Sequence, residues 1–195
     1  MMMKRIPLLQ SLVAASGLIL LLACAGHRDA PVPPKATGLD YTDPAGTGWR
    51  LVKSPASTST HLVLELKAPA TAAGLGVGFK LTVDPATAQW AKVAAADATY
   101  VKNAAYDLGS DTTSQLLKAK ASGGELAVGA YQKGTAHPVT YGGAIISVAM
   151  DFKTSSTLNA GTVIPLAVAK AQHVGADGSN VDIQPLLQVG TLKGK

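Results

Sequence analysis

Apolar and polar residues alternate along several short stretches of the chain, and this pattern predicts β-strands. Residues 61–67, HLVLELK, carry a leucine at every second position. Residues 77–83, VGFKLTV, repeat the alternation with Lys80 and Thr82 on the polar side. Alternation with a period of two is typical of a strand that has one face on a core and the other in water. Both stretches are therefore predicted strands.

Later stretches continue this pattern between turn signals. Residues 144–152, AIISVAMDF, place apolar residues on one face and Ser147 on the other. Pro165 interrupts the strand-like run of residues 161–172, and because proline has no N–H for a ladder, we expect an edge position or a bulge there. The dipeptide Asp177-Gly178 is typical of a β-hairpin turn. The C-terminal third is thus predicted to be strands joined by tight turns.

The whole pattern predicts an all-β chain. Strand signals recur at intervals of roughly ten to fifteen residues, separated by clusters of Gly, Pro, Asp and Ser. Residues 125–131 and 185–194 read as further strands, whereas residues 112–124 fit a strand or a short helix. We therefore expect an antiparallel two-sheet β-sandwich of the jelly-roll type.

The N-terminal region has the zones of a secretory signal peptide. Lys4 and Arg5 precede an apolar stretch, residues 8–22, and small residues follow. The apolar stretch has about 15 residues, fewer than the roughly 20 that a membrane-spanning helix needs. Cys24, the only cysteine of the chain, ends the sequence LLAC, which resembles the lipobox of bacterial lipoproteins. The resemblance implies removal of residues 1–23 and acylation of Cys24, for example with palmitate; an ordinary signal peptide that ends near a cysteine is the alternative.

The predicted lipid would decide where the protein lies. Two or more acyl chains hold a protein stably at a membrane without a spanning helix. Ala25 rather than aspartate follows Cys24, and in lipoproteins of Gram-negative type this implies export to the outer membrane. Residues 24–38, rich in Pro, Gly and Ala, predict a flexible tether, and residues 39–195 predict one domain. With no second cysteine, this domain depends on its core alone.

Two stretches together resemble the cohesin and carbohydrate-binding-module group of β-sandwiches. Residues 74–93, GLGVGFKLTVDPATAQWAKV, combine a glycine-led strand, an Asp-Pro turn and Trp90, which we expect in the core. Residues 144–183 combine a strand, an Ala-Gly turn, a second strand and an Asp-Gly hairpin. The resemblance implies a cohesin-like sandwich with a binding role rather than a catalytic one. It does not extend to residues 46–72, which lack the group's usual early strand pair.

Charge and motifs exclude several classes of function. The formal net charge is +5, but the lysines are spread singly and form no basic stripe, so we expect no nucleic-acid partner. The four histidines, which have no metal-ligand spacing, are His27, His61, His137 and His173. No nucleophile elbow or Ser/His/Asp order is evident. We therefore expect no enzyme and no required cofactor.

One acidic loop offers a candidate calcium site. Asp177, Asn180 and Asp182 lie close together in the sequence GADGSNVD, and calcium prefers several oxygen ligands. The same residues also make an ordinary hairpin turn, and both interpretations stay open.

Carbohydrate binding would need aromatic rings on an exposed surface, where they can stack on sugar faces. The tyrosines nearest to predicted loops are Tyr100, Tyr106, Tyr131 and Tyr141. These four are the candidate sugar-binding residues.

These features predict a non-enzymatic lipoprotein of the cell envelope whose sandwich binds an extracellular protein or a polysaccharide. The alternative is a structural or assembly subunit that docks on an envelope complex by a sheet edge.

Overall fold

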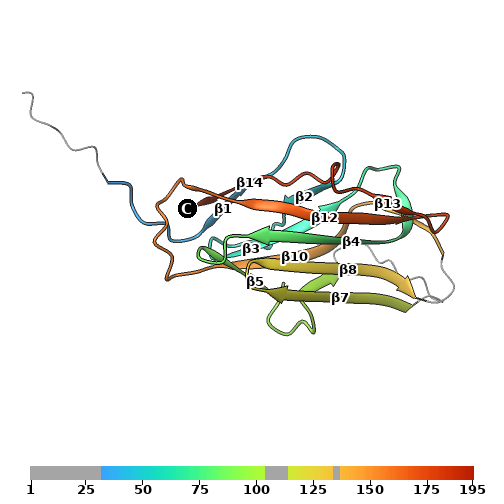
Figure 1. Ribbon diagram of the computed structural model, residues 1–195, viewed down its shortest axis with the longest axis horizontal. Coiled ribbons are helices and arrows are strands. Elements are labelled where there is room, and N and C mark those ends of the chain that lie inside the picture. The colour runs from blue at the N-terminus through green and yellow to red at the C-terminus, as the bar shows by residue number, and fades with distance from the viewer. Residues whose placement is uncertain (1–31, 104–113, 134–136) are drawn as a thin grey trace, which may run out of the picture. The chain divides into compact units, whose positions relative to one another are not determined.

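The computed structural model describes residues 32–103, 114–133 and 137–195, and the chain forms fourteen β-strands and no helix in these ranges (Figure 1). No described helix is therefore long and apolar enough to cross a membrane. The lipidation site Cys24 and the predicted signal peptide lie outside the described residues. Residues Pro33–Lys195 form one compact unit.

The largest sheet has six strands in the order β13-β12-β4-β8-β7, with β9 paired to β4. All its pairs are antiparallel, and in Figure 1 β12, β4, β8 and β7 lie side by side. The strands are β4 (Ala73–Val83), β7 (Ser114–Ser122), β8 (Glu125–Lys133), β9 (Val139–Thr140), β12 (Leu166–Gly175) and β13 (Asn180–Asp182).

The second sheet has five strands in the order β2-β3-β10-β5, with β6 also paired to β10. Its strands are β2 (Arg50–Lys53), β3 (His61–Lys67), β5 (Ala88–Ala91), β6 (Val101–Asn103) and β10 (Ala144–Phe152). A third sheet, in the order β1-β14-β11, consists of β1 (Leu39–Thr42), β14 (Thr191–Gly194) and β11 (Val163–Ile164).

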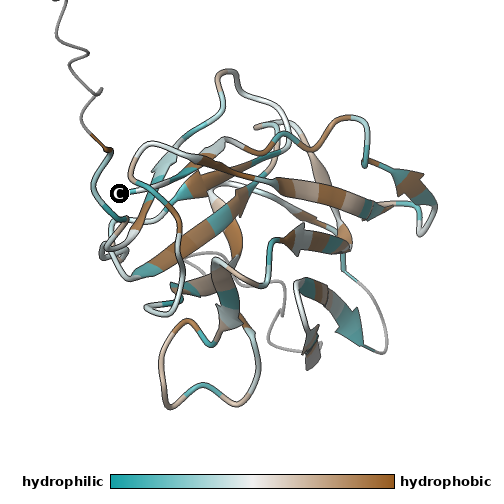
Figure 2. Cartoon of the chain, turned by 60° about the vertical axis from the view of Figure 1, so that its left-hand side comes forward, coloured by the Kyte–Doolittle hydropathy of each residue, from teal (hydrophilic) through white to brown (hydrophobic). Residues whose placement is uncertain are grey.

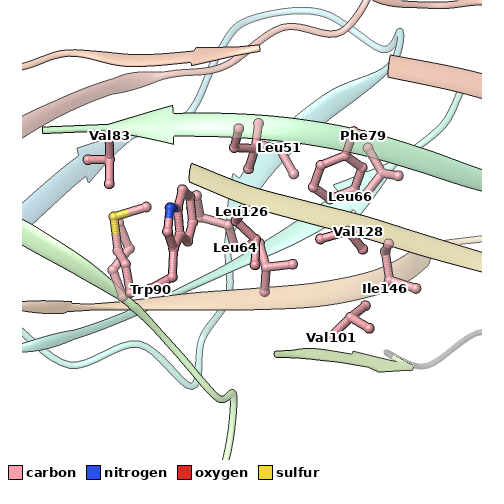
Figure 3. Close-up of a cluster of buried hydrophobic side chains, with 14 of the residues drawn as sticks. Leu51, Leu64, Leu66, Phe79, Val83, Trp90, Val101, Leu126, Val128 and Ile146 are labelled. Carbon is pink, nitrogen blue, oxygen red and sulfur yellow. The ribbon is translucent and has the colours of Figure 1, made fainter. Parts of the chain in front are cut away.

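The two larger sheets enclose the core. Leu64 and Leu66 of β3 face Phe79 of β4 and Leu126 of β8, and Trp90 fills the space beside them (Figure 3). Banding of apolar and polar residues along the strands is visible in Figure 2. The predicted strands at residues 61–67 and 77–83 are confirmed, and so is the burial of Trp90. The antiparallel β-sandwich expected from the sequence is the fold of the protein.

Pro165 marks the point where the chain changes sheets. The two residues before it, β11, pair with β14, and the residues after it, β12, pair with β4. A register shift follows between Val168 and Lys170. The missing proline N–H thus falls between two ladders, which agrees with the expected interruption.

Two details differ from the sequence prediction, and one alternative that the sequence left open is resolved. Ser147 was expected to face water, but it is buried, as are Ile145 and Ala149 on the same side of β10, so both faces of this strand are covered. Residues 112–124 contain a strand, β7, rather than a helix. The closing strand β14 takes only the last part of the predicted run 185–194.

The compact unit begins before residue 39. The Ala36 N–H donates to the Leu158 carbonyl at 2.8 Å, and the Thr37 N–H donates to the Lys195 carbonyl at 2.7 Å. Ala36 is buried. The end of the predicted tether, residues 34–38, is therefore attached to the sandwich, because backbone pairing outweighs its loop-like composition.

Candidate functional site

The outward side of the six-stranded sheet gathers lysines that are far apart in the sequence. Strand pairing aligns Lys120 of β7 with Ala127 of β8, Ala127 with Lys80 of β4, and Lys80 with Lys170 of β12. Lys118 lies in the next row, opposite Gly129. We call this surface the lysine face; its members are Lys80, Lys118, Lys120, Glu125, Ala127, Gly129, Tyr131, Lys170 and Gln172.

Positive charge predominates on the lysine face. Lys80 Nζ lies 3.0 Å from Glu125 Oε1, and both side chains are about half exposed. Within the described part of the chain, Lys118, Lys120 and Lys170 form no ion pair. The face thus presents four lysines and one carboxylate. Such a surface favours an acidic partner and speeds its association.

The centre of the lysine face is built from small residues beneath one aromatic ring. A Cβ added at Gly78 would meet the Tyr131 hydroxyl, and one added at Gly129 would lie 2.9 Å from Tyr131 Cε2. The ring therefore lies across the backbone of β4 and β8, where glycine leaves space for it. Gln172 Nε2 donates to the Tyr131 hydroxyl at 3.4 Å. A hollow of about 180 Å³ adjoins the ring and is bordered by Lys80, Lys170 and Gln172.

The lysine face is not evident from the sequence. Lys118 and Lys120 share β7, whereas Lys80 lies on β4 and Lys170 on β12, so no run of basic residues appears. The sequence did predict the outward orientation of Lys80, because Lys80 alternates with inward apolar residues in the predicted strand at residues 77–83. The alignment of Lys80 with Lys120 and Lys170 depends on which strands are neighbours, and that information is not local.

The four candidate tyrosines do not form a common site. Tyr131 lies on the lysine face, whereas Tyr100 is partly buried against the core just before β6. Tyr106 lies outside the described residues. Tyr141 was expected in an exposed loop, but its ring is only 1% exposed and can offer no face to a sugar. The prediction for Tyr141 is wrong because its ring packs into an aromatic cluster at one end of the sandwich.

This aromatic cluster consists of Trp49, Tyr141 and His173. The ring centroid of Trp49 lies 5.9 Å from that of Tyr141 and 5.1 Å from that of His173. The Tyr141 and His173 centroids are 5.5 Å apart. Because burial disfavours its charged form, the pKa of His173 is lowered below the ordinary value of 6.5, although a hydrogen bond with the Ala73 backbone partly opposes this.

We expect His173 to make the fold sensitive to acid. Because the pKa of His173 is lowered in the folded protein, the unfolded chain binds the proton more tightly. The contribution of neutral, buried His173 to the free energy of unfolding is therefore complete above about pH 6.5 and falls as the pH drops below that value. Urea unfolding at pH 7.5 and pH 5 should show a loss of unfolding free energy in the wild type that is smaller in His173→Asn. An equal loss in both proteins would contradict this role of His173.

The candidate calcium residues lie in the β12–β13 hairpin. Asp177 Oδ1 accepts hydrogen bonds from the Ser179 N–H at 2.9 Å and from Ser179 Oγ at 2.6 Å, and the Ser179 hydroxyl lowers the pKa of Asp177. Asp182 Oδ1 accepts from the Gln184 N–H at 2.9 Å. No group of three His, Cys, Asp or Glu side chains in the described ranges could hold a metal ion. These contacts fit an ordinary turn, and calcium binding at Asp177, Asn180 and Asp182 stays a prediction.

His61 forms the one described His–carboxylate pair. Its Nδ1 lies 2.6 Å from Asp151 Oδ1, and its Nε2 lies 3.1 Å from the Val93 carbonyl oxygen. A general base needs one ring nitrogen free to take a proton from a nucleophile or water. Both nitrogens of His61 are occupied by acceptors, so the pair serves to fasten the segment around Val93 to β3 and β10.

No protein-family model matches the chain, and no curated protein matches it either. Among solved structures, it resembles a type II cohesin domain from the cellulosome of Acetivibrio cellulolyticus, with a TM-score of 0.54 and 12% identity over 76% of this chain and 95% of that domain. A cohesin module of a Clostridium perfringens family 33 glycoside hydrolase gives a TM-score of 0.46 and 10% identity over 81% of this chain and 96% of the module. The first of these likenesses, together with the antiparallel sheets, shows that the chain folds as a cohesin-like β-sandwich.

Proposed function

We propose that this chain is a non-enzymatic binding module that docks a protein partner on its lysine face and is held at the cell envelope by a lipid on Cys24. The observation that carries the proposal is the alignment of Lys120, Lys80 and Lys170 in one row across four strands. The cohesin-like fold adds support, since it offers sheet faces rather than a catalytic cleft.

The shape of the lysine face favours a protein over a small ligand. Small-molecule sites are concave and bury most of the ligand, whereas the hollow beside Tyr131 has a volume of only about 180 Å³. Surrounding lysines would pair with acidic side chains at the rim, where charge sets association rate and selectivity more than affinity. Tyr131 would serve as the aromatic anchor, a residue type enriched among the energetically dominant positions of interfaces.

A polysaccharide is the second candidate ligand. Tyr131 favours it, because its ring lies flat on Gly78 and Gly129 and sugar-binding surfaces use such rings for stacking. A glycan array probed with the wild type and Tyr131→Ala tests this candidate. Sugar retention that is lost in the variant would place the chain among carbohydrate-binding modules instead.

Envelope attachment is the second part of the proposal. It is supported by the basic start, the apolar stretch and the LLAC sequence that ends at Cys24. We propose the outer membrane of a Gram-negative cell, because Ala25 follows the cysteine.

The docking surface can be tested in living cells by site-specific photocrosslinking. A photoreactive amino acid at position 170 should form an adduct with a protein, because Lys170 is an exposed member of the lysine face. The matched control is position 89, since Gln89 is exposed on β5 of the opposite sheet. Equal adducts from both positions, or protein adducts from position 89 only, would exclude the lysine face.

A further inference from the structure

Strand β7 lies at one end of the six-stranded sheet. Among the described residues, β8 is its only hydrogen-bonded neighbour, and β7 is nine residues long. In an antiparallel pair, alternate residues direct their backbone N–H and C=O groups away from the partner strand. Such an edge is a template for pairing with another chain unless it is short, bulged, covered or protected by charged side chains such as lysine. The register of β7 with β8 runs without a shift from Ser114 to Ser122, so the edge is regular.

The inward side chains of β7 are incompletely covered. Leu117 and Ala119 point toward the core but remain partly exposed, whereas their neighbours Val128 and Ala130 on β8 are buried. A shallow hollow of about 460 Å³ runs along β7 and β8; besides Thr99, Leu117 and Ala119 its lining includes Lys118, Lys120, Ala127, Val128 and Gly129, so it is not confined to the inward side. An additional strand would complete the burial of these apolar atoms, which is favourable because each buried methylene contributes about 0.8 kcal/mol.

The outward side chains of β7 determine which residues an added strand must carry. Lys118 and Lys120 are exposed, and within the described ranges neither forms an ion pair. Opposite charges on directly facing strand residues are stabilising, and like charges are destabilising. The strand that fits therefore carries acidic residues on its outer side and apolar residues on its inner side.

We propose that β7 accepts an extended acidic–apolar segment of a partner protein as an added strand of the sheet. The proposal deepens the binding function proposed above and rests on it, since it names how the partner is held. Backbone hydrogen bonds from the β7 edge would supply affinity, and the alternating side chains would supply selectivity.

A second copy of this chain fits the edge poorly. If two β7 strands paired in antiparallel register about Ala119, Lys118 of one copy would face Lys120 of the other. A register centred on Lys118 would place the two Lys118 side chains opposite each other. Like charges in directly facing positions destabilise such a pair. In these two central registers, charge disfavours a second copy and favours a different, acidic chain as the occupant.

The probe for this proposal is a seven-residue peptide of alternating glutamate and valine, measured by fluorescence anisotropy against the full chain carrying Cys24→Ser. We expect it to bind at least tenfold more tightly than a peptide of the same composition with its glutamates and valines in two blocks. The double variant Lys118→Glu/Lys120→Glu should weaken binding at least tenfold. Lys92→Glu/Lys193→Glu makes the same charge change at exposed positions elsewhere and should leave binding unchanged.

Backbone methylation separates strand addition from simple charge attraction. One edge of the added strand faces β7, so N-methylation of one alternate set of peptide amides should abolish binding, while methylation of the other set should preserve it. Equal effects of the two sets, or equal affinity for the block peptide, would overturn the proposal. If the peptide does not bind as expected but position 170 still crosslinks to a protein, strand addition at β7 is excluded and the proposed docking function stands. If the peptide binds but position 170 crosslinks to no protein, strand addition stands and docking on the lysine face is excluded.

Discussion

Trp90→Ala is expected to lower the free energy of unfolding by about 3–5 kcal/mol, as is typical for truncating a buried aromatic residue to alanine. Trp90 is 6% exposed and lies among the side chains of both large sheets (Figure 3). Its Nε1 also donates to the Gly124 carbonyl at 2.9 Å, which joins β5 to the turn between β7 and β8. The variant loses both the packing and this bond between the sheets.

Urea unfolding followed by circular dichroism measures this loss, and Trp90→Phe is the matched control. The phenylalanine keeps much of the apolar volume and removes one of the two donors to the Gly124 carbonyl, which still accepts from the Val83 N–H at 2.8 Å, so we expect a smaller cost of about 1–2 kcal/mol. A Trp90→Ala protein that unfolds at nearly the same urea concentration as the wild type would show that this contact between the sheets is not a major source of stability.

Cys24→Ser is expected to move the protein from the membrane fraction to the soluble fraction. The serine cannot carry the thioether-linked lipid, and no described helix could replace the lost anchor. Acyl chains contribute about 0.8 kcal/mol per buried methylene, so their removal eliminates nearly all of the membrane affinity. The fold should be unaffected, because Cys24 precedes the compact unit Pro33–Lys195.

Membrane fractionation with immunodetection measures the redistribution, and mass spectrometry of the N-terminal peptide shows whether Cys24 is acylated. Ala25→Ser, one residue further on, is the matched control and should remain with the membranes. If Cys24→Ser stayed membrane-bound, the lipid anchor would be refuted, and an uncleaved signal peptide would become the simpler explanation.

Strands were predictable where side-chain alternation is local and one face is buried. The runs around Leu64 and Phe79 show this, because neighbours within each run already encode the inner and outer faces. Strand β10 shows the limit, since Ser147 alternates with apolar residues but is buried by elements that lie far away in the sequence. Alternation reports the period of a strand, while burial of the second face depends on what packs over it.

Contacts made across the sheets were less predictable. Tyr41 gave no sequence signal, yet it is 4% exposed, and its hydroxyl donates to the Leu51 carbonyl at 2.9 Å and accepts from the Gly190 N–H at 2.6 Å. Burial raises the pKa of Tyr41 to about 12. The lysine face is the same kind of case, because Lys80, Lys120 and Lys170 become neighbours only through strand order.

The most direct test of the docking proposal is the affinity of the protein that crosslinks to position 170, measured with purified components at two salt concentrations. We expect Lys80→Glu/Lys170→Glu to weaken binding at least tenfold, and we expect the wild-type affinity to fall as salt rises, because the rim charges are exposed and screened. Lys92→Glu/Lys193→Glu, with the same change in net charge, should bind like the wild type. If both double variants bound the partner as tightly as the wild type, the lysine face would not be the docking surface.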